Sequence, residues 1–163
     1  MTVPNDISLK SQNTLRDLVR DDWTFSGMCF WRRDFLTYQN DPNDACLVLD
    51  WQLSVDFIYR CLISGLIEII NYERYADNAA LVDDLRRCNP FDMQKGGLAW
   101  NGVFTYGTEQ LEAIVKRFFK NDDEYASTVN REFIAAIGKA FEDAGVPWSN
   151  KPLIPVLSHI SPL

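Results

Sequence analysis

The chain has 163 residues, of which 47% are hydrophobic, 13% aromatic and 24% charged, and its formal net charge is −7. This composition is typical of a folded protein rather than a disordered one, and the length suits one domain with a full core. No uncharged apolar stretch reaches about 18 residues, so no membrane partner is expected.

The N-terminal sequence lacks a basic segment followed by an apolar run, so a signal peptide is not expected and we place the protein in the cytoplasm. Its four cysteines are scattered, without a CxxC pair or a cluster of histidines. Zinc is therefore not expected, and in a reducing cytosol all four should remain thiols.

The first helix is expected over about residues 7–20, with Leu15, Leu18 and Val19 facing inward. Residues 23–40 are rich in aromatic side chains at near-helical spacing, which favours a short helix. The sequence thus begins with two helical segments.

A strong helix start follows at Asp41-Pro42-Asn43-Asp44, since Asp41 can cap and Pro42 suits the first turn. We expect a helix over about residues 42–64 that ends at Gly65. Its polar residues lie four apart in one narrow stripe, Gln52, Asp56, Arg60 and Ser64. A helix that is apolar on its other sides is expected to be buried, and this one is predicted to be the central helix of the core.

The second half of the chain predicts a strand over residues 66–72, a helix over 77–88, a second strand over 98–106 and helices over 108–119 and 123–144. A turn at Asn101-Gly102 remains an alternative within the second strand. The fold class is therefore mostly α (α+β): a single-domain helical bundle, residues 1–163, with a short two-stranded β ribbon. Residues 146–163 contain several prolines and are expected to form an extended tail over the surface.

The charge is unevenly distributed along the chain. Residues 41–84 hold nine acids and two bases, whereas residues 1–40 hold five of each. This acid-rich segment is either a solvated face or a surface that steers and docks a basic partner.

No arrangement of residues points to catalysis, a cofactor or a metal. The single histidine, His159, lies near the C-terminus, and no phosphate-binding glycine motif or calcium loop occurs. Adjacent carboxylates such as Asp21-Asp22 point in different directions on a helix and do not form an acid–base pair by spacing alone. We therefore expect no catalytic, cofactor-binding or metal-binding residues, and we do not expect an enzyme.

The phrase SVDFIYRCLISGLIEII, residues 54–70, is similar to the helix–glycine–strand phrase of many winged-helix DNA-binding domains. A helix that reads DNA needs basic or amide side chains, yet residues 41–64 offer only Arg60 against four aspartates. DNA phosphates would repel this segment, and Arg60 is expected to pair with Asp56 one turn away. We therefore expect a core helix and no nucleic-acid partner.

In overall character, the acid-rich segment 41–84 and the aromatic stretches around Trp31, Trp51 and Trp100 resemble bacterial immunity proteins of polymorphic toxin systems, including contact-dependent growth inhibition. The resemblance implies a protein that binds a cognate toxin domain, of the basic nuclease type, and blocks its active site or substrate channel. Aromatic anchors ringed by carboxylates would carry the affinity. The candidate partner-binding residues are Asp41, Asp44, Asp77, Asp83, Asp84 and Trp100.

Competing explanations stand beside these candidates. Asp41 and Asp77 suit helix capping, and Trp100 suits packing of the ribbon onto a helix. Two other function classes remain open. One is a transcription regulator or adaptor with a winged-helix-like fold, and the other is an enzyme whose site is scattered in sequence. The sequence does not indicate an oligomeric state.

Overall fold

The computed structural model describes residues 5–30, 45–70, 74–90, 97–120, 126–149 and 151–157. In chain order its elements are α1 (Asn5–Asp17), β1 (Trp23–Thr24), α3 (Ala45–Ile63), β2 (Ile67–Ile70), α4 (Asn78–Arg87), α5 (Gly97–Asn101), β3 (Phe104–Gly107), α6 (Glu109–Phe118) and α7 (Arg131–Asp143). These elements confirm the predicted mostly helical α+β fold class.

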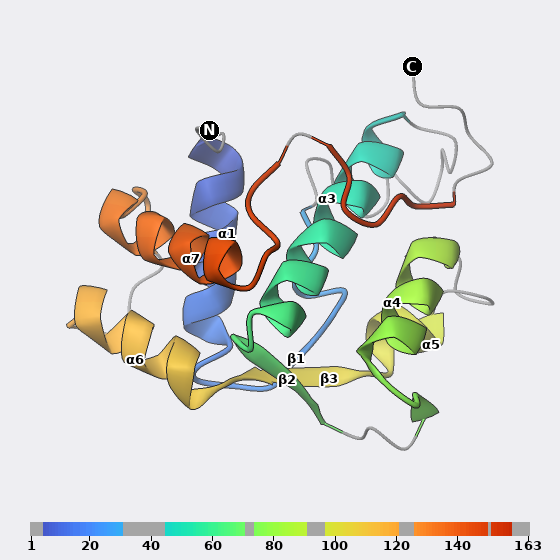
Figure 1. Cartoon of the computed structure of the whole chain (residues 1–163), viewed down its shortest axis with the longest axis horizontal. Coiled ribbons are helices and arrows are strands. Elements are labelled where there is room, and N and C mark those ends of the chain that lie inside the picture. The colour runs from blue at the N-terminus through green and yellow to red at the C-terminus, as the bar shows by residue number, and fades with distance from the viewer. Residues whose placement is uncertain are drawn as a thin grey trace.

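Helix α3 is the central element, as predicted. Figure 1 shows it between α1, α6 and α7 on one side and α4 and α5 on the other. Its residues Val55, Ile58 and Cys61 have no exposed area. A helix with apolar residues on most of its sides is stable in such a position because neighbouring elements cover each side.

Gly65 ends this helix and turns the chain into β2. Its φ of 69° is in the left-handed region, which glycine adopts without steric cost. The amide of Leu66 donates to the Cys61 carbonyl at 3.0 Å, and the Gly65 amide donates to the Leu62 carbonyl at 3.2 Å. This pair of bonds is a Schellman cap, so the predicted stop at Gly65 is confirmed.

The sheet has three antiparallel strands in the order β1-β3-β2, one more than the predicted ribbon. The pairing of β2 with β3 is as expected, but β1 was missed because two residues are too short for a periodic pattern. The short helix expected over residues 23–40 is wrong at Trp23 and Thr24, which form β1, and residues 31–40 lie outside the described residues.

The predicted strand over residues 98–106 is also wrong in its first half. Residues 97–101 form α5, and the Gly102 amide donates to the Leu98 carbonyl at 3.0 Å to close its last turn. The chain therefore uses the alternative bend near Asn101-Gly102, and β3 begins only at Phe104. Packing of the Trp100 ring into the core decides this local structure over the strand pattern.

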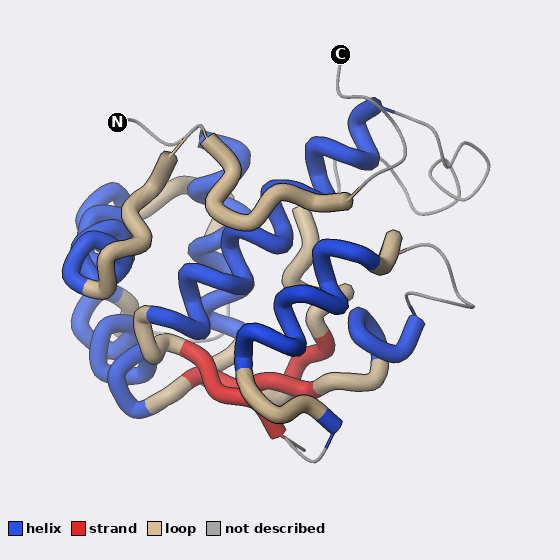
Figure 2. Tube along the Cα trace, turned by 45° about the vertical axis from the view of Figure 1, so that its right-hand side comes forward, coloured by secondary structure: helices blue, strands red, loops and turns tan. Residues whose placement is uncertain are grey.

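The sheet has one covered and one solvent-facing side. Figure 2 shows the strands along the lower border of the molecule with the helices above them. Ile67, Ile69 and Thr105 are buried on the side facing the helices, whereas Glu68 and Phe104 are exposed on the other side. None of the described helices is long and apolar enough to cross a membrane.

Candidate functional site

Of the predicted partner-binding aspartates, Asp41 and Asp44 lie outside the described residues. Asp77 is exposed and caps α4, since its Oδ1 accepts a hydrogen bond from the Ala80 amide at 2.8 Å. This contact supports the capping explanation for Asp77, because it satisfies a helix N–H that has no partner within the helix.

Asp83 is neutralised within its own helix. Its Oδ1 accepts from Arg86 Nε at 2.7 Å, and its Oδ2 accepts from Arg87 Nε at 2.6 Å. The hydrogen bonds from Arg87 and Arg86 lower the pKa of Asp83. Two guanidinium groups therefore surround this carboxylate, and its negative charge is not concentrated at the surface.

Asp84 is half-buried and lies beside the Tyr75 phenol. Burial and the neighbouring Asp84 carboxylate raise the pKa of Tyr75 to about 12. This aspartate thus faces a tyrosine of its own domain. Because Asp83 is paired with two arginines and Asp84 faces Tyr75, the acidic surface of α4 is weaker than its sequence suggested.

The prediction that Trp100 is an exposed anchor is wrong. Its side chain has no exposed area, and its Nε1 donates to the Cys88 carbonyl at 2.7 Å. An indole placed in the core needs such an acceptor, because an unpaired buried N–H is costly. Trp100 therefore joins α5 to the end of α4 and presents no surface to a partner.

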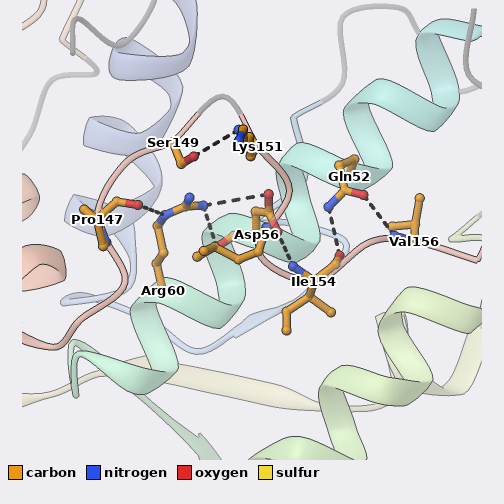
Figure 3. A network of polar contacts seen from close by, with 9 residues as sticks. Gln52, Asp56, Arg60, Pro147, Ser149, Lys151, Ile154 and Val156 are labelled. Atoms are coloured by element: carbon orange, nitrogen blue, oxygen red, sulfur yellow. Dashed lines mark hydrogen bonds and ion pairs between the residues drawn. The ribbon is translucent and has the colours of Figure 1, made fainter.

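The polar stripe of α3 binds the chain's own C-terminal region. We call residues 151–157 the C-terminal strap; they form neither helix nor strand and lie along α3 (Figure 3). Asp56 Oδ1 accepts from the amides of Leu153 and Ile154, both at 3.1 Å. Gln52 donates to the Ile154 carbonyl at 2.9 Å and accepts from the Val156 amide at 2.9 Å.

Arg60 completes this stripe. Its Nε donates to the Pro147 carbonyl at 3.2 Å, and its Nη1 lies 4.0 Å from Asp56 Oδ2, as the predicted i,i+4 pair. Burial raises the pKa of Asp56 and lowers the pKa of Arg60. Both charged groups thus bind main-chain atoms of the same chain, so neither is available to a substrate or to DNA.

The buried thiols are likewise structural. Cys29 and Cys61 have no exposed area, and burial raises the pKa of each thiol. A nucleophilic cysteine needs the thiolate, which a dry apolar environment disfavours. Among the described residues, no group of three or more histidine, cysteine, aspartate or glutamate side chains is arranged to hold a metal ion.

The remaining candidate binding surface is the solvent-facing side of the sheet. We call it the outer sheet face and define it as Asp22, Thr24, Glu68, Ile70, Phe104 and Tyr106. The strand register places Thr24, Phe104 and Ile70 in one row across the sheet. The same register places Tyr106 beside Glu68 and, extended by one residue, beside Asp22.

This face combines accessible aromatic rings with negative charge. Phe104 is 42% exposed, although phenylalanine is among the residues most often buried. Tyr106 donates its hydroxyl proton to Glu68 Oε2 at 2.6 Å. That hydrogen bond, followed by the negative charges of Glu68 and Asp22, raises the pKa of Tyr106. Tyr106 is therefore flanked by two carboxylates, and Phe104 lies exposed in the neighbouring row.

Sequence reasoning missed this face because its members come from three separate strands. Of its two carboxylates, only that of Glu68 belongs to the acid-rich segment 41–84. The available signal was Glu68 between the apolar Ile67 and Ile69, since a polar residue in that place faces solvent and the period of two in a strand puts Ile70 on the same side. The partners of these two residues depend on the register with β3.

A second surface feature is an open groove of about 460 Å³ between α6 and α7, near the end of α3. Arg117 and Lys139 line it, and Lys139 donates to both carboxylate oxygens of Asp143 at 2.9 Å. These two charged groups therefore pair with each other along α7. The groove has no buried titratable group aimed into it among its lining residues.

Comparison with known proteins identifies no relative. No family model matches the chain, and no curated protein or solved structure matches it. Any function proposed for this protein therefore rests on its own residues.

Proposed function

We propose that this chain is an immunity protein that binds a basic toxin domain and thereby neutralises it. The observation that carries the proposal is the outer sheet face, where the exposed Phe104 lies in the row next to Tyr106, and Tyr106 lies between Glu68 and Asp22. Aromatic residues dominate the binding energy of protein interfaces, and surrounding polar groups exclude water from them.

The charge of the chain supports a basic partner. A net charge of −7 accelerates association with a cationic domain, and the carboxylates on the outer sheet face would meet its basic side chains. Nuclease toxins bind a polyanion, so an acidic surface seated on the nucleic-acid site would block substrate. Inhibition would then be occlusion, with no chemical step by this protein.

The contacts and burial of the other polar groups also favour a binding role. Asp56 and Arg60 hold the C-terminal strap, and the Cys29 and Cys61 thiols are buried in the core. The described residues thus offer no buried acid or nucleophile that opens into a polar pocket. We place the protein in the cytoplasm, where a toxin delivered into the cell would act.

A pull-down from native lysate at low and moderate salt, followed by mass spectrometry, tests the proposal. Wild type should retain one basic protein in stoichiometric amount, and Glu68→Lys should weaken retention. Glu142→Lys is the matched control, since Glu142 is an exposed acid near the end of α7, away from the sheet. Retention of nucleic acid, or of no stoichiometric protein, would refute the immunity function.

A winged-helix-like adaptor is the second candidate. The succession of α1, β1, α3 and β2 and the helix–glycine–strand connection at Gly65 favour it. Such an adaptor would contact protein rather than DNA, because α3 is covered: Arg60 is only 2% exposed and the C-terminal strap lies along the polar stripe. The same pull-down separates the two candidates by the identity of the retained protein.

A further inference from the structure

The outer sheet face presents two neighbouring rows of side chains. In the acidic row, Tyr106 lies between Glu68 and Asp22. The Phe104 row, two positions along β3, consists of Ile70, Phe104 and Thr24. Directly opposite residues of an antiparallel pair have Cβ atoms about 5 Å apart, and residues two apart on a strand are about 7 Å apart. A cation placed at Tyr106 is therefore near both carboxylates and about one helical turn from Phe104.

The carboxylates of the acidic row are open to a cation from another molecule. Glu68 and Asp22 are both exposed, and among the described residues neither has a basic partner. Acids on the helices differ in this respect, since Glu112 pairs with Lys116 one turn away. The Tyr106 hydroxyl donates to Glu68 Oε2 at 2.6 Å and so holds one of the two carboxylates in place.

The aromatic side chains narrow the kind of cation. A guanidinium group packs on an aromatic ring, and its planar fork can donate to two carboxylates at once. A lysine ammonium is a compact, strongly hydrated charge without such a fork. The combination of a tyrosine with a carboxylate on each side therefore favours arginine over lysine.

The spacing of the two rows indicates the backbone that carries this arginine. Side chains four apart on a helix have Cβ atoms about 6 Å apart, which suits one residue in the acidic row and one on Phe104. An extended segment laid across the face would have a similar spacing, but it would press unpaired N–H and C=O groups against side chains. A helix pairs these groups internally, so its burial costs less.

We propose that the outer sheet face binds a basic helix of the partner. One arginine of that helix lies against Tyr106 between Glu68 and Asp22, and an apolar residue one turn along packs on Phe104. Such a helix is read by residues on a single face, which is a common mode of peptide recognition. The exposed ring of Phe104, at 42%, is the apolar contact that this mode requires.

This inference rests on the proposed function for the source of the helix, but synthetic peptides test it separately. The probe is a blocked alanine–glutamine helix with two arginines, each followed four residues later by leucine, all on one face. In the control peptide leucine follows each arginine after two residues, so composition and charge are the same but arginine and leucine lie on different faces. Circular dichroism verifies equal helicity, and NMR titration of the whole chain follows the amide signals of Glu68, Phe104 and Tyr106. The probe should bind about tenfold more tightly than the control, because the control contacts only one row at a time.

Three variants sharpen the test. Glu68→Lys should weaken binding of the probe about tenfold, whereas Glu142→Lys, with the same change in net charge, should behave as wild type. Phe104→Ala should bring the two peptides to nearly equal affinity, because leucine loses its contact. Equal affinity of both peptides for wild type, signal shifts confined to other surfaces, or equal weakening by Glu142→Lys would overturn the inference.

The two proposals fail in different ways. If the probe binds the outer sheet face but the pull-down retains no basic protein, the helix site stands and the immunity function falls. If a basic protein is retained but the probe binds no more tightly than the control peptide, the function stands and the helix site is wrong.

Discussion

Replacing Asp56 by alanine should detach the C-terminal strap from α3. One carboxylate oxygen accepts both the Leu153 and Ile154 amides, and the other lies 4.0 Å from Arg60 Nη1. The substitution leaves two main-chain donors without their acceptor. It also leaves the Arg60 guanidinium buried without its carboxylate, next to the Trp148 ring at 5.3 Å.

The size of the effect can be worked from these contacts. A hydrogen bond to a charged group contributes roughly 1.5–3 kcal/mol, so two of them contribute roughly 3–6 kcal/mol. Leu153 and Ile154 are only half-buried, and water can replace part of the lost bonding. We therefore expect Asp56→Ala to lower the free energy of unfolding by about 3 kcal/mol, a large share of the roughly 5–15 kcal/mol typical of a domain.

The conservative variant Asp56→Asn keeps an oxygen acceptor and the side-chain volume. It loses only the charge, so its cost should be about 1 kcal/mol, near the value of one ordinary hydrogen bond. Comparison of the two variants separates the contribution of the acceptor from that of the charge.

Urea unfolding and amide exchange measure these effects. With a slope of about 2 kcal/mol per molar urea, Asp56→Ala should lower the midpoint by about 1.5 M. The Leu153 and Ile154 amides should exchange faster in this variant and nearly as in wild type in Asp56→Asn. A loss in Asp56→Ala below about 1 kcal/mol, or unchanged exchange at both amides, would refute the assignment of Asp56 as the anchor of the strap.

Other consequences of the structure are open to simple measurement. Glu68→Gln should bring the raised pKa of Tyr106 back toward 10, because both the carboxylate acceptor and its charge are lost. NMR titration of labelled tyrosine measures this pKa, and an unchanged value would contradict the Tyr106–Glu68 bond. The Cys29 and Cys61 thiols should resist a thiol reagent in the native protein and react after denaturation, since burial raises their pKa and excludes the reagent; rapid native labelling of either would contradict their burial. Asp77→Ala should cost about 1 kcal/mol of stability, measured by urea unfolding, as loss of a helix cap does, while partner retention in the pull-down stays at the wild-type level.

Features that depend only on neighbouring residues could be predicted from the amino-acid sequence. Asp77 begins α4, Thr108 begins α6 and Gly65 ends α3, as their local chemistry predicts. These signals act within one helical turn, so no distant contact is needed to read them. The buried character of α3 also followed from its apolar sides.

The contacts of the polar and aromatic residues, in contrast, became known only from the folded structure. Asp56 binds amides about a hundred residues further along the chain, and Trp100 donates to a carbonyl just past the end of α4. The outer sheet face depends on the pairing of Thr24 with Phe104, which lie far apart in sequence. The local sequence pattern indicates whether a side chain faces the core or the solvent. Packing and strand register determine which distant group that side chain contacts, because such contacts form only when the whole chain has folded.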